Sequence, residues 1–141
     1  MAKRDRTERE VRRHLASRGI GDDIAEAAIA ELGRQGYVDD ARFAVRFAED
    51  RRALDGWGSE RIERRLRELG VPEEHVAAAG GARTHDDERA AALDLLVRRF
   101  PSLGEDPRDR ERAFGVLVRK GFEPELAGDA VRQHARSGSA A

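Results

Sequence analysis

The chain has 141 residues, enough for one ordinary domain, and its 27 basic and 28 acidic residues leave a net charge of −1. It contains no cysteine, which excludes disulfides, thiolate metal sites and thiol nucleophiles. No run approaches the roughly 18 apolar residues of a membrane-spanning helix, and the start has no apolar stretch typical of a signal peptide, so we expect a cytoplasmic protein.

Large apolar side chains are scarce and charges are segregated. Hydrophobic residues make up 39% of the chain, but 23 of them are alanines, which leaves 32 large apolar side chains. Basic and acidic blocks alternate, with net charges of +4 over 1–20, −5 over 21–41, +2 over 42–70, −4 over 71–88, +3 over 89–120 and −1 over 121–141. So thin a core with charged outer faces favours a slender array of helices.

Helical periodicity predicts an all-α fold with helices near 7–18, 22–34, 40–54, 59–69, 72–79, 85–99, 107–120 and 123–136. Capping residues mark several starts: the capping box Thr7-x-x-Glu10, then Asp39/Asp40, Ser59 and Thr84. Pro107 and Pro124 suit first-turn positions. The last residues, 137–141, are predicted to form a disordered tail.

An internal repeat with an offset of 51 residues organises these helices. It superposes three leucines and three glycines: Leu15, Leu66 and Leu117, and Gly19, Gly70 and Gly121. Each copy predicts a helix that ends at a glycine in the left-handed region, followed by an apolar residue and a second helix with an acidic or proline-containing start. A further helix precedes the second and third copies, so the unit is a three-helix repeat whose first copy is truncated.

The predicted architecture is therefore a set of tandem three-helix repeats in an elongated, curved array. The expected divisions are a truncated first repeat over 1–35, a central repeat over 36–80, a C-terminal repeat over 81–136 and the tail over 137–141.

Catalytic, cofactor and metal sites find no support in the sequence. Phosphate-binding glycine loops are absent, and the four histidines have no i, i+4 pairing of the kind that zinc sites use: His14, His75, His85 and His134. Most carboxylates sit beside arginines at helical spacings. We therefore expect a binding protein that is not an enzyme.

Trp57, the only tryptophan, lies between Gly56 and Gly58 at a predicted helix junction. Two interpretations stay open. In the first, Trp57 folds back over the joint and Gly56 adopts a positive φ. In the second, it is an exposed aromatic anchor for a partner.

Two arginine rows are the other candidates for partner binding. Arg61 and Arg65 are i, i+4 neighbours beside the apolar stripe of their helix, and Arg42 and Arg46 repeat this arrangement one helix earlier. Neighbouring arginines repel and favour an anion between them. The alternative is that they bridge to the acidic blocks 21–41 and 71–88.

The segment around Gly70 also resembles the turn of a DNA-binding helix-turn-helix. Acidic residues argue against that function, because the second helix begins with Asp22/Asp23, Glu73/Glu74 or Glu125 in the three copies, where phosphates would be repelled. A basic arginine row elsewhere leaves open a salt-sensitive, sequence-independent contact with DNA.

Several elements in order resemble the RecX family of recombination regulators. They are the run from Gly36 to Ala44 (GYVDDARFA), Gly56-Trp57-Gly58, Arg61-Ile62 with Leu66, Gly70-Val71, and the segment from Arg112-Ala113-Phe114 to Lys120-Gly121-Phe122. The resemblance covers most of the chain after residue 10.

The resemblance implies a regulator that binds RecA filaments on single-stranded DNA and lowers recombination, strand exchange and ATPase activity, without catalysis, cofactor or membrane. From helix geometry we assign Arg42, Arg46, Trp57, Arg61 and Arg65 to the partner surface of a monomer. The alternative is a non-specific nucleic-acid-binding helical protein that acts without RecA.

Overall fold

A computed structural model describes residues 6–36 and 38–139. Within these ranges the chain forms helices and turns, and its one β-bridge joins Arg6 to Val38. The elements are α1 (Glu8–Ser17), α2 (Asp22–Arg34), α3 (Asp40–Asp50), a π-helical turn η1 (Arg51–Asp55), α4 (Ser59–Glu68), α5 (Glu73–Gly80), α6 (His85–Arg99), α7 (Pro107–Lys120) and α8 (Pro124–Ser139).

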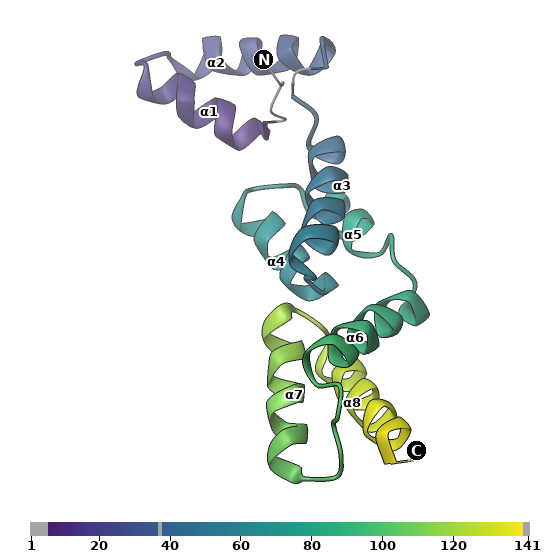
Figure 1. The fold of residues 1–141 in the computed structure, drawn as a ribbon. Coiled ribbons are helices and arrows are strands. Elements are labelled where there is room, and N and C mark those ends of the chain that lie inside the picture. The colour runs from purple at the N-terminus through teal and green to yellow at the C-terminus, as the bar shows by residue number, and fades with distance from the viewer. Residues whose placement is uncertain (1–5, 37, 140–141) are drawn as a thin grey trace.

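The helices form three groups placed end to end (Figure 1). The pair α1 and α2 lies at one end, the group α3 to α5 in the middle, and the group α6 to α8 at the other end. The accessible surface of 9023 Å² exceeds the roughly 7300 Å² expected of a compact monomer of this mass. The predicted elongated array of three-helix repeats with a truncated first copy is confirmed.

Each group has its own small core, so burial is local to a repeat. Val11, Ile29 and Val38 form the first. The second core contains Ile62, Leu66, Val71 and Val76. The third is the largest and is built around Leu96, Leu117, Phe122 and Leu126. Buried alanines in the second and third cores let helices approach closely, which explains how 32 large apolar residues suffice.

The three repeat-ending glycines have the predicted left-handed conformation, with φ of 76° at Gly19, 85° at Gly70 and 101° at Gly121. The same pair of backbone hydrogen bonds closes each turn. The longer bridge runs from the residue after the glycine to the repeat leucine, as Ile20 N to Leu15 O, Val71 N to Leu66 O and Phe122 N to Leu117 O, at 3.0–3.1 Å. The 51-residue repeat is therefore present at the level of individual hydrogen bonds.

The second and third repeats meet through the ends of two helices. Gly58 N donates to Lys120 O at 2.8 Å, and Glu60 N donates to Gly121 O at 3.0 Å. The first N–H groups of α4 thus satisfy the last carbonyls of α7. A Cβ on Gly58 would lie 2.5 Å from the Gly121 carbonyl and 2.6 Å from Phe122 N. Only a glycine at position 58 permits this backbone contact.

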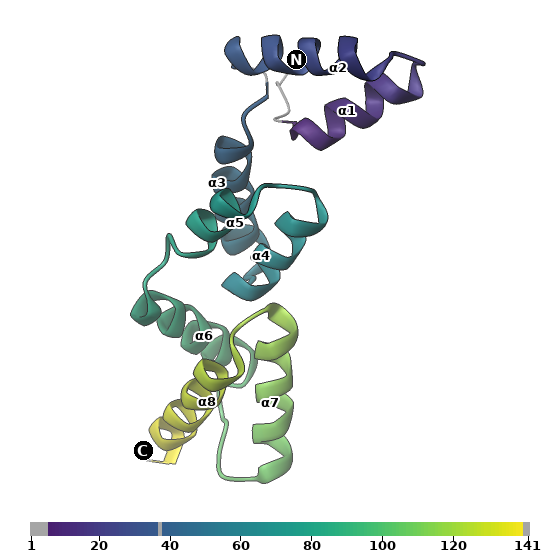
Figure 2. The same cartoon turned by 180° about the vertical axis from the view of Figure 1, so that it is seen from behind.

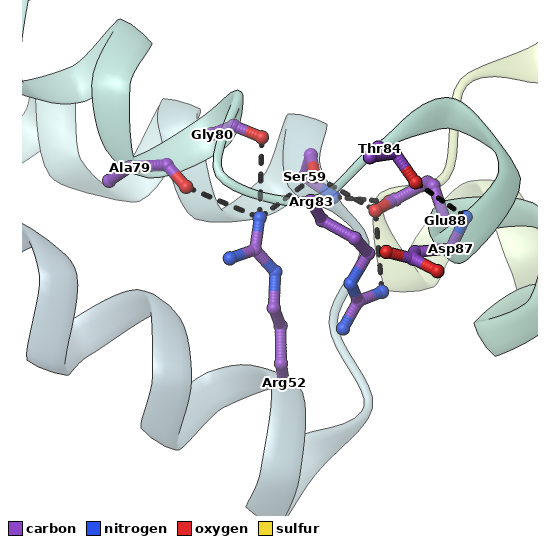
Figure 3. A network of polar contacts seen from close by, with 8 residues as sticks. All are labelled: Arg52, Ser59, Ala79, Gly80, Arg83, Thr84, Asp87 and Glu88. Atoms are coloured by element: carbon purple, nitrogen blue, oxygen red, sulfur yellow. Dashed lines mark hydrogen bonds and ion pairs between the residues drawn. The ribbon is translucent and has the colours of Figure 1, made fainter.

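A buried polar network closes the same junction (Figure 3). The Glu88 carboxylate of α6 accepts hydrogen bonds from Ser59 N at 2.8 Å and Ser59 Oγ at 3.0 Å, and pairs with Arg83 at 3.3 Å. Arg52 donates to Ser59 Oγ at 3.1 Å and to two carbonyls at the end of α5, those of Ala79 and Gly80. The predicted Ser59 cap was wrong: Gly58 is the N-cap, and Glu88 supplies the capping carboxylate from the next repeat.

The first and second repeats meet through side chains. Arg9 Nη1 donates to Glu68 O at 2.8 Å, and the Arg9 side chain covers Gly70, where a Cβ would meet its Cδ at 2.2 Å. Glu8 N donates to Asp40 Oδ1 at 3.1 Å. The start of a helix again meets the glycine turn of the next repeat.

Two element predictions need correction. The helix predicted over 40–54 ends at Asp50, and η1 widens its last turn before Gly56 turns the chain. The tail predicted as disordered is helical through Ser139, because Ala135 is buried and Gly138 passes close to Leu103 O. Residues 140–141 lie outside the described residues.

Gly58→Ala tests the backbone contact between the repeats. The φ of −79° at Gly58 suits alanine, so the effect isolates the steric clash with Gly121. We expect the free energy of unfolding in urea to fall by about 2–3 kcal/mol. Gly104→Ala is the control, since its Cβ would meet nothing within 4 Å, and it should change stability by less than about 0.5 kcal/mol. Equal stability of both variants would contradict this junction.

Candidate partner-binding surface

Trp57 is half-buried against the core of the central repeat. Gly56 has φ 67°, as predicted, and turns the chain so that the indole meets Phe47 edge-on at 6.1 Å. The Arg61 guanidinium lies 4.2 Å from the centre of the indole ring, close enough for a cation–π interaction. Trp57 thus covers the helix joint and is itself covered by an arginine.

Arg61 and Arg65 do not form the repelling pair that the sequence suggested. Arg61 donates to Arg119 O at 3.2 Å, and its Cβ lies against Gly121, so it spans the junction to α7. Arg65 points to Glu68 at 2.9 Å, with about half of each side chain exposed. The two arginines share α4 and differ in surroundings: Arg61 is held in place and Arg65 is exposed.

Arg42 and Arg46, the row on α3, also differ in their surroundings. Arg42 is exposed yet donates to Gly36 O at 2.6 Å, which fixes the start of α3 against the connection from α2. The backbone N–H of Arg42 donates to Asp39 Oδ1 at 3.0 Å and so caps the start of α3. Arg46, one turn later, is exposed on the surface of α3.

Arginines outside the two rows bridge to the acidic blocks. Arg67 meets Glu73 across the glycine turn at 2.8 Å, which raises the pKa of Arg67 and lowers the pKa of Glu73. Arg12 meets Glu26 at 2.8 Å. Arg83 pairs with Glu88 at 3.3 Å. Arg52 donates to Ser59 Oγ, which itself donates to Glu88, and burial lowers the pKa of Arg52. Sequence reasoning missed these partners because each pair is joined by tertiary folding and has no helical spacing.

Positive charge gathers on one side of the array. The equivalent helices α1, α4 and α7 lie along the same side in both views (Figures 1 and 2). Five basic and two acidic residues lie on α7, whereas α2 carries one basic and four acidic residues. The helix that would be the recognition helix of a helix-turn-helix is thus acidic in α2 and α5 and balanced in α8. The basic side suits an anionic partner.

Across residues 6–36 and 38–139, no group of three or more histidine, aspartate or glutamate side chains is arranged to hold a metal ion. Among the described helices, none is long and apolar enough to span a membrane.

Comparison with known proteins identifies the family. The family model for the first three-helix domain of RecX matches residues 1–32, and the model for the second matches residues 39–79. A regulatory protein RecX of Stenotrophomonas maltophilia is 36% identical over 137 residues, covering 96% of this chain and 80% of the relative. This chain belongs to the RecX family. A RecX of Amycolatopsis mediterranei is 31% identical over 96% of the chain and 79% of the relative.

Solved RecX structures have the same fold. The crystal structure of RecX from Lactobacillus salivarius matches with a TM-score of 0.81 at 19% identity, covering 93% of this chain and 86% of that one. A second RecX crystal structure matches with a TM-score of 0.73 at 23% identity, over 87% of this chain and 62% of the other. The chain is thus a regulatory protein of the RecX type in both sequence family and fold.

The single tryptophan reports on the Arg61 contact. Arg61→Ala removes the guanidinium from the Trp57 ring, so we expect the fluorescence emission of Trp57 to shift to the red and its quenching by acrylamide, which is uncharged, to rise. Arg65→Ala is the matched control on the same helix and should leave both signals unchanged. Identical spectra for the two variants would show that Arg61 does not cover the indole.

Glu63 gives a pH-dependent prediction. Burial raises the pKa of its carboxyl above the ordinary 4.5, so its ionisation destabilises the fold as pH rises through the folded-state pKa. Glu63→Gln should therefore raise the melting temperature at pH 7, and this gain should vanish at a pH below about 4.5, where Glu63 is protonated in both states. A gain of equal size at both pH values would show that another cause acts.

Proposed function

We propose that this RecX-family chain regulates RecA by binding its filament on single-stranded DNA and lowering strand exchange and ATPase activity. Family membership and the elongated array support this proposal. The observation that carries it is the gathering of basic helices α1, α4 and α7 along one side, which provides an extended surface for a long, repetitive partner. The chain acts as a monomer and by binding alone.

In this proposal the candidate residues have two different tasks. Arg46 and Arg65 are exposed, and they contact acidic groups of the filament. Arg61, Trp57 and Arg42 hold the surface in shape: Arg61 packs on Trp57 and the α7 junction, and Arg42 fixes the start of α3. Exposed charges steer and orient a partner, so reversing their sign should weaken binding without unfolding the chain.

The test is inhibition of RecA-driven strand exchange by Arg46→Glu combined with Arg65→Glu. We expect the concentration needed for half-inhibition to rise about tenfold or more, which corresponds to about 1.4 kcal/mol. Circular dichroism should show unchanged helicity, since both side chains are exposed.

The control combines Arg34→Glu with Arg132→Glu. These two arginines are also exposed, and each is paired with an acid three residues away, as Arg65 is with Glu68. The two double variants change the net charge equally, because each replaces two arginines with glutamates. Full inhibition by the first double variant, or equal loss in both, would contradict the assigned surface.

A further inference from the structure

A basic groove runs along α7 and the end of α6, on the C-terminal repeat. Its larger part has a volume of about 580 Å³ and is lined by four arginines, Arg99, Arg108, Arg112 and Arg119, together with Phe100 and Glu111. A smaller hollow of about 140 Å³ shares Arg99 and Arg119 with it and adds Arg61 and Lys120. The groove therefore continues to the junction with the central repeat.

The three arginines of α7 form one row. Arg112 and Arg119 follow Arg108 by four and eleven residues, so all three lie within about 40° on the helix and span roughly 16 Å along it. Gly115 lies within this row, and the Arg119 guanidinium lies over it, where a Cβ would meet Nη1 at 3.0 Å. The three guanidinium groups therefore form a line along the groove.

The charge of this row is little compensated. In the part of the chain that the structure describes, the guanidinium groups of Arg99, Arg108 and Arg119 make no ion pair or hydrogen bond. Arg112 lies 3.9 Å from Asp109, and 74% of its side chain is exposed. Among the described residues that line the groove, Glu111 is the one acidic residue. Such a row attracts a polyanion.

An aromatic ring adjoins the cations. Phe100 is half-buried at the end of α6, and the Arg112 guanidinium lies 6.0 Å from its ring centre. Planar guanidinium groups match phosphate oxygens, and aromatic rings stack on bases in a sequence-tolerant way. A polymer with a negative charge and a flat ring on each unit can contact both the arginines and Phe100. An acidic peptide can contact only the arginines.

We propose that this groove binds single-stranded nucleic acid without sequence preference, with successive phosphates along Arg108, Arg112 and Arg119 and a base against Phe100. This surface is separate from Arg46 and Arg65, and the ligand is not RecA. The groove lies on α7, one of the basic helices proposed to face the filament, but its test uses no RecA, so its failure and the failure of the proposed function are distinguishable.

The test is binding of the full chain to a dye-labelled oligodeoxythymidylate of about 20 nucleotides, followed by fluorescence anisotropy over a salt series without RecA. The groove variant combines Arg108→Ala, Arg112→Ala and Arg119→Ala. The control combines Arg34→Ala, Arg98→Ala and Arg132→Ala, which removes equal charge from exposed arginines elsewhere. Circular dichroism checks that both remain helical.

We expect the groove variant to bind at least tenfold more weakly at low salt, and the slope of log affinity against log salt to fall by about 2, at roughly 0.7 per lost phosphate contact. The control should stay within about twofold of the unmodified chain. Phe100→Leu should weaken binding and leave the slope unchanged, because it removes stacking and no charge.

Three outcomes would overturn the proposal. They are absence of binding by the unmodified chain, equal loss in both triple variants, and binding of a labelled oligoglutamate as tight as that of the oligonucleotide. The last would identify the groove as a site for an acidic protein segment. RecA is absent from the assay, so none of these results bears on regulation of RecA.

Discussion

The end-to-end meeting of α7 with α4 is the contact on which the rest of the array depends. The left-handed glycine at position 121 stops α7 abruptly and leaves carbonyls facing outward, and the free N–H groups of α4 bind them directly. The positive end of one helix dipole thus faces the negative end of another. Because Gly58 has no side chain, the backbones touch. Backbone hydrogen bonds and the Glu88 network hold these repeats together where large apolar residues are few.

This arrangement also determines where the charges lie. Since the starts of α1 and α4 meet the glycine turns of the following repeats, α1, α4 and α7 are brought to one side of the array. Their basic residues gather there, while acidic α2 packs behind α1. Arg108 and Arg112 are exposed in the first turns of α7. A single structural rule therefore produces both the rigid junction and the cationic surface.

Local signals were enough to predict the helices, the glycine turns and the repeat, because leucine spacing and left-handed glycines act within a few residues. Features that depend on tertiary contacts were not predictable. Ser59 resembled a cap by itself, but Glu88 from the next repeat supplies the carboxylate. Arg61 and Arg65 looked equivalent on one helix, yet only Arg61 meets α7. The tail at 137–139 stays helical because Gly138 packs near Leu103, a contact that the sequence does not reveal.

The central claim is that this array regulates RecA on its filament, and the most direct measurement is the single-stranded-DNA-dependent ATPase activity of RecA with increasing amounts of this protein. The measurement is made at two salt concentrations, with a control for competition for DNA. Inhibition well below one regulator per RecA subunit is the result that the account predicts. Absence of inhibition, or inhibition fully explained by occupied DNA, would contradict it.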